Sequence, residues 1–299
     1  MYNKFIFAFV VFVLSYALST VAQTQDPKTV ARAKIVTWNI QMLPNSLAFL
    51  SNALRKKQCV RTPWIIDHCL KKDYDVIVFQ EVFDLDIKRK LKKGLKDSYP
   101  YQVNTKTKAG RIISNGILIV SRLPMKYIDH VIYAKGAHTD GFSAKGCTLV
   151  EVEKKDLKFH IAGTHLQSGG SKAAIMHRDL QFQEIRNLLD SNILDQVPVF
   201  VMGDMNTRKS NTEKYPKMIE VIGVNDYPLD ESAPYTYDAN NSWNNNDVPV
   251  QIDYVLLQAR KTNTKILKQK VLRPKHNYKG KPMDLADHYG IVAEIEVSN

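Results

Sequence analysis

Cysteine is scarce in this chain, which has three among its 299 residues: Cys59, Cys69 and Cys147. They form no CxxC pair and no cysteine–histidine spacing of the kind that holds structural zinc, so the sequence predicts no zinc-stabilised domain. In an exported protein an odd number leaves at least one thiol unpaired or bonded to another chain. Cys59 and Cys69 are nearest in sequence, but Cys69 lies along a predicted helix, which argues against a bridge between them.

Apolar runs of membrane-spanning length are absent, and so are internal repeats. The longest apolar run, 5–18, is too short and too soon followed by polar sequence to span a bilayer. Lys4 precedes this run and the small residue Ala22 follows it, which is the pattern of a secretory signal. We therefore predict a cleaved leader at 1–22 and a single secreted, monomeric domain at 23–299, with an uncleaved anchor as the alternative.

Acidic residues are in deficit. The chain has 30 Asp and Glu against 42 Lys and Arg, a formal net charge of +12. A surface of this charge attracts anions such as nucleic acid or anionic lipid headgroups. The charge therefore bears on which partners the protein meets, and it does not specify a reaction.

Strand-like segments outnumber helical ones. Apolar and β-branched runs predict strands at 34–39, 75–81, 99–103, 116–121, 128–133, 145–152, 158–164, 199–202, 251–257, 262–272 and 291–297. Helical spacing and start signals predict helices at 62–72, 84–97, 175–189 and 214–222, and 234–249 is a long polar loop. Two packed sheets covered by outer helices fit this pattern better than a plain sandwich or a barrel.

The stretch 198–206, PVFVMGDMN, is a short buried strand that turns at Gly203 into polar sequence. Asp204 and Asn206 therefore stand at the carboxyl end of a rigid strand, where open α/β sheets place their chemistry. An acid beside an amide suits a reaction in which charge develops on a phosphate. The alternative is an ordinary turn, since Asp and Asn favour turns for local hydrogen-bonding reasons.

Four further polar residues, Asn39, Glu81, His165 and His288, also follow apolar strands. Strand ends can converge on one rim of a pair of sheets, so these side chains predict a single cleft. A carboxylate that closes a buried strand, as Glu81 does, requires a metal or a basic partner unless it emerges into solvent. Carboxylates and amides with two histidines suit a hard cation and phosphoryl chemistry better than zinc.

The polar strand ends occur in a recognisable order. WN at 38–39, QE at 80–81, TH at 164–165, GDMN at 203–206, DY at 253–254 and DH at 287–288 resemble the endonuclease/exonuclease/phosphatase superfamily. The segments QEVFD, NGILIVSRLP, YAKG, FSAKG and GTHLQ resemble the bacterial sphingomyelinase C family within it. The resemblance implies a four-layer α-β-β-α fold of two mixed sheets, like deoxyribonuclease I. It also implies hydrolysis of sphingomyelin to ceramide and phosphocholine with Mg²⁺, or with Mn²⁺ or Co²⁺ in its place.

The same resemblance implies roles for the metal and the base. Glu81 is similar to the family's principal Mg²⁺ ligand, with Asn39 beside it, and Asp287 could bind the second face of the metal site. His288 is similar to the general base that takes a proton from water. A carboxylate neighbour orients such a ring, and Asp253 is the expected partner.

The remaining roles concern the diester. His165 and Asn206 are expected to donate hydrogen bonds to the phosphoryl oxygens, and Asp204 to hold the water or the imidazole. The residues expected to bind substrate are Asn115, Lys145, Tyr235 and Trp243.

Several positions depart from the family's pattern. Ser168-Gly169-Gly170 follows GTHLQ where the family has acidic residues, and Leu85 replaces a polar ligand of an accessory metal. The segment 272–283 carries four basic residues and only one large aromatic residue, Tyr278, where haemolytic relatives have a membrane-inserting pair. We expect electrostatic, transient docking on a sphingomyelin-containing membrane, with a solvated loop as the alternative.

Two other functions compete with this one. A secreted nuclease of the same fold would explain the net charge and would bind nucleic acid, but it leaves FSAKG and NGILIVSRLP unexplained. A catalytically inactive lipid-binding or adhesion module is disfavoured, because every catalytic position holds a chemically competent residue.

Overall fold

The computed structural model describes residues 29–44, 52–104, 113–194, 196–244 and 248–298. The predicted leader at 1–22 lies outside these residues. Among the described helices, none combines the length and the apolar character needed to cross a bilayer.

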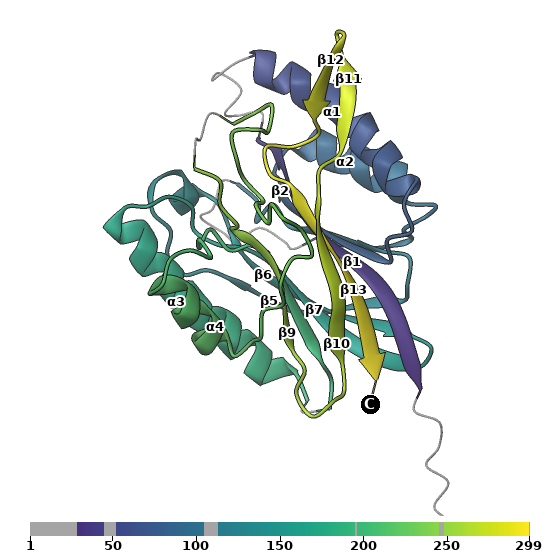
Figure 1. The fold of residues 1–299 in the computed structure, drawn as a ribbon, viewed down its shortest axis with the longest axis vertical. Coiled ribbons are helices and arrows are strands. Elements are labelled where there is room, and N and C mark those ends of the chain that lie inside the picture. The colour runs from purple at the N-terminus through teal and green to yellow at the C-terminus, as the bar shows by residue number, and fades with distance from the viewer. Residues whose placement is uncertain (1–28, 45–51, 105–112, 195, 245–247, 299) are drawn as a thin grey trace, which may run out of the picture.

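Two mixed sheets form the centre of the molecule (Figure 1). The first has the order β10-β13-β1-β2-β4-β3, and the second has the order β5-β6-β7-β8-β9. The strands of the first sheet are β10 (Lys265–Leu272), β13 (Gly290–Ser298), β1 (Val30–Met42), β2 (Val76–Val82), β4 (Leu118–Ser121) and β3 (Tyr101–Asn104). Those of the second are β5 (Met125–Ile132), β6 (Gly146–Lys154), β7 (Leu157–His165), β8 (Val199–Asp204) and β9 (Asp253–Gln258). The pairs β1–β2 and β7–β8 are parallel, and the other pairs are antiparallel.

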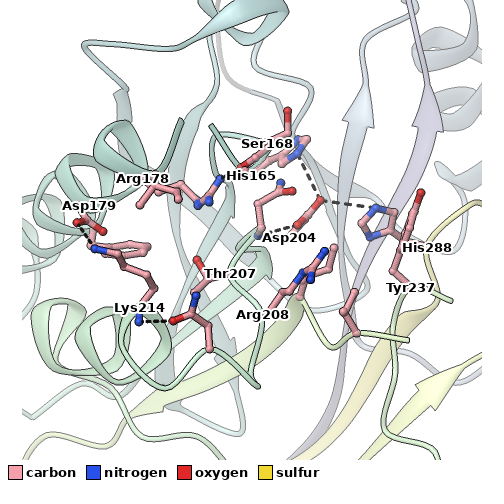
Figure 2. Close-up of a pocket in the computed structure, with 18 of the residues that line it drawn as sticks. His165, Ser168, Arg178, Asp179, Asp204, Thr207, Arg208, Lys214, Tyr237 and His288 are labelled. Atoms are coloured by element: carbon pink, nitrogen blue, oxygen red, sulfur yellow. Dashed lines mark hydrogen bonds and ion pairs between the residues drawn. The ribbon is translucent and has the colours of Figure 1, made fainter. Parts of the chain in front are cut away.

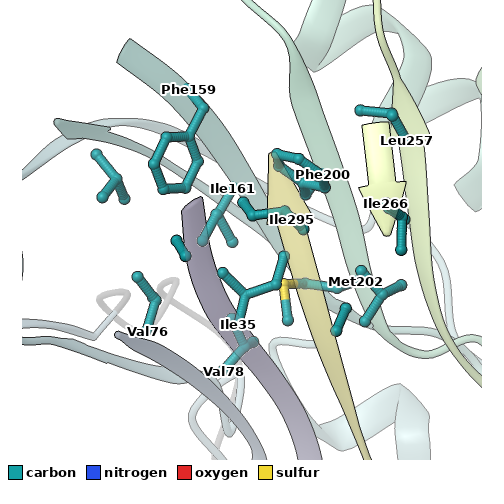
Figure 3. Packing of buried hydrophobic residues seen from close by; sticks show 14 of the residues in the cluster. Ile35, Val76, Val78, Phe159, Ile161, Phe200, Met202, Leu257, Ile266 and Ile295 are labelled. Atoms are coloured by element: carbon teal, nitrogen blue, oxygen red, sulfur yellow. The ribbon is translucent and has the colours of Figure 1, made fainter. Parts of the chain in front are cut away.

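Helices cover the outer face of each sheet. In Figure 1, α1 (Asn52–Leu70) and α2 (Leu85–Leu95) lie on one side, and α3 (Lys172–Asn192) and α4 (Lys214–Ile222) lie on the other. Between the sheets the buried side chains interdigitate, with Ile35 and Val78 of the first sheet near Ile161 and Phe200 of the second (Figure 3). Each such side chain contributes about 1.5–3 kcal/mol by leaving water. The predicted four-layer fold is confirmed.

Helix α1 begins ten residues before its predicted start, at Asn52, and Pro63 lies inside it. The buried side chains of this part of the helix are polar ones, Gln58, Arg61 and Thr62, so apolar periodicity does not reveal it. Arg61 is fully buried, and its guanidinium donates to the main-chain oxygens of Ile40, Gln41 and Leu285. The predicted start at 62 was wrong for this reason.

Several strand boundaries also differ from the prediction, most notably those of β9 (Asp253–Gln258) and β10 (Lys265–Leu272). Asp253 is the first residue of β9, not a residue in its middle, and it pairs with Asp204 at the end of antiparallel β8. β10 starts at Lys265, because the segment before it forms a turn closed by the Thr262 hydroxyl and the Ala259 carbonyl. Because β9 begins at Asp253, the carboxylate of this residue lies at the same rim of the sheet as Asp204.

The basic segment before β13 forms a two-stranded hairpin, β11 (Lys275–Tyr278) and β12 (Lys281–Asp284), beside α1 (Figure 1). Trp64 of α1 stacks on His276 at 4.0 Å between ring centroids and meets Tyr278 edge-on at 6.0 Å. The hairpin is therefore packed against the body of the protein.

All three cysteines are free thiols, so Cys59 and Cys69 are not bridged. Cys69 and Cys147 are buried, and burial raises the pKa of the Cys69 thiol to about 12. Cys59 is exposed on α1.

Gly203 lets β8 approach β7 closely at the rim. Its φ is +154°, and a Cβ placed on it would lie 1.9 Å from the main-chain oxygen of Thr164. We expect Gly203→Ala to lower the free energy of unfolding by about 3 kcal/mol, because the clash is with backbone that cannot rotate away. Chemical denaturation measures this. Gly170→Ala is the matched control, since a Cβ there meets nothing within 4 Å, and equal stability of the two variants would contradict the argument.

Candidate active site

A cavity of about 570 Å³ opens at the rim where strands of both sheets end. Six of the residues predicted from the sequence line it: Glu81, His165, Asp204, Asn206, Asp287 and His288. They come from segments more than 200 residues apart, as Figure 2 shows for His165, Asp204 and His288. The strand ends therefore converge.

Asp204 lies at the centre of this cluster. Its Oδ2 accepts a hydrogen bond from Asn39 Nδ2 at 3.1 Å and lies 3.4 Å from His165 Nε2 and 3.8 Å from His288 Nε2. Its Oδ1 accepts from the main-chain N–H of Asn206 at 2.9 Å. Burial alone would raise the pKa of Asp204, but the charges of His288 and Lys145 and the hydrogen bond from the Asn206 N–H outweigh it and lower the pKa. Asp204 is therefore ionised.

Glu81 leaves β2 in an unusual backbone conformation, with φ of +57°. The register between β1 and β2 shifts at this point, and such irregularities re-aim side chains. Glu81 Oε1 accepts from Asn39 Nδ2 at 3.2 Å and lies 3.9 Å from His165 Nε2. Burial and the neighbouring Asp287 raise the pKa of Glu81 to about 7. A nearby cation would hold this carboxylate in its charged form.

His288 is fixed by a carboxylate on its far side. Its Nδ1 lies 2.9 Å from Asp253 Oδ2, and its Nε2 faces Asp204. The Tyr237 ring packs edge-on against the imidazole at 5.0 Å between centroids. Burial would lower the pKa of His288, but Asp253 and Asp204 together raise it well above its usual value. The ring therefore presents one nitrogen to the cavity in a fixed orientation.

His165 is held differently, by Lys145. Lys145 Nζ lies 3.0 Å from His165 Nε2 and also donates to Asp140 Oδ2 at 2.9 Å and to the Leu166 oxygen at 3.1 Å. Burial and the Lys145 charge lower the pKa of His165 well below its usual value. His165 is therefore neutral, with Nε2 accepting, and the ammonium of Lys145 supplies the positive charge at this point.

The donor set fits a divalent cation. Glu81, Asp204 and Asp287 place three carboxylates around one cavity, and Asp204, Asp253 and His288 offer ligand atoms within 4.8 Å of one another. Asp287 Oδ2 accepts from Gln41 Nε2 at 2.7 Å, whereas its buried Oδ1 has no hydrogen-bond partner among the described residues. Burial raises the pKa of Asp287. Buried carboxylate oxygens of this kind are the ligands that hard cations prefer.

Comparison with known proteins agrees with this geometry. Residues 36–273 match the model of the endonuclease/exonuclease/phosphatase family. The chain belongs to that family. A sphingomyelinase C of Leptospira interrogans is 33% identical over 247 residues, which are 75% of this chain and 44% of the relative. A sphingomyelinase C of Bacillus cereus is 27% identical over 271 residues, covering 81% of this chain and 80% of the relative.

A solved structure extends the comparison to the metal. A mutant form of beta toxin from Staphylococcus aureus, with bound magnesium ions, superposes with a TM-score of 0.70 at 25% identity, over 88% of this chain and 99% of that one. The chain spans less than half of the length of the Leptospira relatives that it matches. Together with the buried Asp204, Asp253 and His288 group, the magnesium-bound relative supports a divalent-metal site in this member of the family.

The four residues expected to bind substrate do not line the cavity within the described part of the chain. Lys145 stands behind His165, as described above. Asn115 is buried and its Oδ1 accepts from the Ile117 N–H, while its Nδ2 has no partner among the described residues.

The two aromatic residues that were expected to bind substrate, Trp243 and Tyr235, instead make contacts that hold their own loop in place. Trp243 donates Nε1–H to the Asp284 oxygen and packs under Lys57 and Arg61. Tyr235 contributes its main-chain oxygen to Arg273, at 3.3 Å from Nη2.

Sequence reasoning missed Tyr237, Arg178 and Arg208, which do line the cavity. Tyr237 stands two residues after Tyr235 in the same loop, and its bridge to Val250 turns it toward the rim. Arg178 shares the buried face of α3 with Phe182 and Ile185, at helical spacing. A charged residue on an apolar helix face was the signal that could have identified it.

Proposed function

We propose that the chain is a Mg²⁺-dependent phosphodiesterase that hydrolyses sphingomyelin to ceramide and phosphocholine. One observation carries the proposal: His288, held through Nδ1 by Asp253, directs Nε2 into the end of the cavity where the carboxylates of Glu81, Asp204 and Asp287 lie. This is the arrangement of a general base facing a cation-assisted diester. The sphingomyelinase C relatives support the choice of substrate.

His288 acts as the base. Asp253 fixes the tautomer in which Nδ1 carries the hydrogen, so Nε2 is left to accept a proton from the attacking water. The raised pKa of His288 arises chiefly from Asp253 and Asp204. A cation held beside Asp204 would oppose this effect and lower the pKa of His288, so that Nε2 could accept a proton.

Glu81, Asn39 and Asp287 would hold the cation, and Asp204 would position the water and the imidazole. When bound, Mg²⁺ polarises the phosphodiester and stabilises the departing ceramide oxygen. Mn²⁺ or Co²⁺ is expected to replace Mg²⁺.

Donors to the phosphoryl oxygens come from the β7 side of Asp204. Asn206 lines the cavity, and its Nδ2 donates one hydrogen to the Leu166 oxygen at 3.2 Å, which leaves the second for a phosphoryl oxygen. Lys145, behind His165, adds positive charge without direct contact as the diester reacts.

The setting of the reaction is also part of the proposal. The protein is a secreted monomer that loses its leader at 1–22 and docks transiently on a sphingomyelin-containing membrane. Lys275, Lys279 and Lys281 on the β11–β12 hairpin carry exposed positive charge for an anionic lipid surface. N-terminal sequencing of the exported protein tests the leader.

Chelation provides the direct test of the reaction. Mature protein is expected to release phosphocholine from sphingomyelin vesicles in Mg²⁺. An excess of EDTA should lower the rate by at least about 10³-fold, because it removes the cation that polarises the phosphodiester. Restoring Mg²⁺ should restore the rate. A rate that is indifferent to EDTA would contradict the proposal.

A nuclease is the second candidate, favoured by the formal net charge of +12. Plasmid DNA in the same assay separates the two functions. Rapid nicking without phosphocholine release would select the nuclease, and phosphocholine release without nicking would exclude it.

A further inference from the structure

The cavity continues beyond the catalytic cluster to a second, basic end. This end, defined by Arg178, Arg208 and Lys214, lies between α3, the loop after β8 and the start of α4. Figure 2 shows Lys214 and Arg178 on the opposite side of Asp204 from His288, and Arg208 below Asp204, between those two residues and His288. A molecule whose phosphate lies beside Asp204 could therefore extend one substituent into the basic end.

Positive charge exceeds negative charge there. Lys214 lies 3.3 Å from Asp179 and 2.9 Å from Glu213, and Asp179 is also held by Lys217 at 2.8 Å. The charge of Asp179 is thus already balanced. Arg178 is nine-tenths buried, and its Nη1 donates to the Gln167 and Gly169 oxygens, each at 2.7 Å.

The charges of the two arginines are not neutralised by a direct ion pair among the described residues. Within the described ranges, neither Arg178 nor Arg208 makes an ion pair. Guanidinium and ammonium groups donate hydrogen bonds and accept none. The basic end therefore suits a substituent rich in acceptor oxygens.

A quaternary ammonium would find little to bind at this end. Such cations are held by the faces of aromatic rings or by available carboxylates. Phe182 lines the cavity but is 1% exposed, and the Tyr237 ring is packed against His288. Asp179, the one carboxylate at the basic end that lines the cavity among the described residues, is engaged by two lysines.

We propose that the basic end binds a polyol headgroup, so that the preferred substrates are sphingophospholipids with hydroxyl-rich headgroups rather than choline. The inference rests on the proposed function, because the acyl chains of such a lipid stay in the bilayer while its headgroup enters the cavity. Hydroxyl oxygens of the polyol accept from Arg208 and Lys214 and carry no opposing positive charge.

The test compares ceramide phosphoinositol with sphingomyelin, at equal surface concentration in mixed micelles with Mg²⁺. The wild-type protein is expected to show a kcat/KM about tenfold higher for the inositol lipid, the effect of roughly one charge-assisted hydrogen bond. In the Arg208→Gln/Lys214→Gln double variant this ratio should fall to about one. Lys217→Gln is the matched control, since Lys217 pairs with the same Asp179 without lining the cavity, and it should keep the wild-type ratio.

The outcomes separate this inference from the proposed function. Hydrolysis of sphingomyelin at a higher kcat/KM than the inositol lipid would overturn the polyol preference and leave the phosphodiesterase intact. A ratio unchanged in the double variant, with unaltered melting temperature, would remove the basic end from headgroup binding. Failure to cleave either lipid would overturn the proposed function and this inference with it.

Discussion

Replacing His288 with Gln is expected to lower kcat on sphingomyelin by about 10³-fold, because the group that takes the proton from water is lost. KM should change little, since the ring contacts the water rather than the lipid. Asp253 would lose its partner, but burial already raises the pKa of this carboxyl to about 6, so it can take up a proton and remain buried in the neutral form. Steady-state phosphocholine release measures the effect.

His130→Gln is the control for the histidine substitution. His130 lies on β5 and its Nδ1 bonds the Tyr127 hydroxyl at 2.6 Å, outside the cavity. This variant should keep the wild-type kcat. If the two substitutions had similar effects on kcat, with both proteins folded by circular dichroism, His288 would not be the base.

Glu81→Gln is expected to have an effect of similar size for a different reason. It keeps the side-chain volume but removes the charge that holds the cation, so kcat should fall by about 10³-fold at fixed Mg²⁺. The activity that remains should require a higher Mg²⁺ concentration. A titration of rate against Mg²⁺ separates this variant from the His288 variant, whose Mg²⁺ requirement should be unchanged.

The same substitution should stabilise the metal-free protein at high pH. The folded-state pKa of Glu81 is raised from its usual value to about 7, so the carboxyl destabilises the folded state increasingly as the pH rises from about 4.5 to 7. In EDTA at pH 8 the Gln variant should be more stable by up to roughly 3 kcal/mol, and at about pH 4.5 the two proteins should be equal. Melting temperatures across this range measure the difference.

Glu294→Gln serves as the control for charge removal, because Glu294 is an exposed carboxylate of β13 that does not line the cavity. It should leave the Mg²⁺ requirement unchanged. If metal-free Glu81→Gln melted below the wild type at pH 8, the Glu81 carboxylate would not destabilise the metal-free folded state as argued above.

The position of the site was predictable because strand ends are a property of local sequence. The sequence itself shows the apolar runs that end in Asn39, Glu81, His165 and Asp204. Packed sheets place such strand ends at one rim. The pairing register places His165 beside Asp204, and Asp204 beside Asp253, on three adjacent strands. The two packed sheets followed from the same runs, whereas their mixed strand directions were implied only by the family resemblance.

The parts that were missed depend on long-range contacts that leave no local pattern. The first half of α1 is buried through Arg61, whose partners are main-chain oxygens far along the chain. Trp243 and Tyr235 were expected to bind the substrate because they lie in the long polar loop 234–249, and long loops in compact domains are often binding elements. In the structure, the Trp243 ring instead packs against Lys57 and Arg61 and so fixes the loop to α1.

The carboxylates of the cavity come from both sheets, Glu81 from β2 and Asp204 from β8, and Asn39 of β1 bonds each of them. An ion bound among these groups would therefore link the two sheets and stabilise their packing against each other. Resistance to proteases would then rise and fall with the surrounding concentration of the ion, by the mass action that links ligand binding to folding. Such a protein would resist proteolysis best at the ion concentrations that also support its activity, and it would be degraded fastest where the ion is scarce.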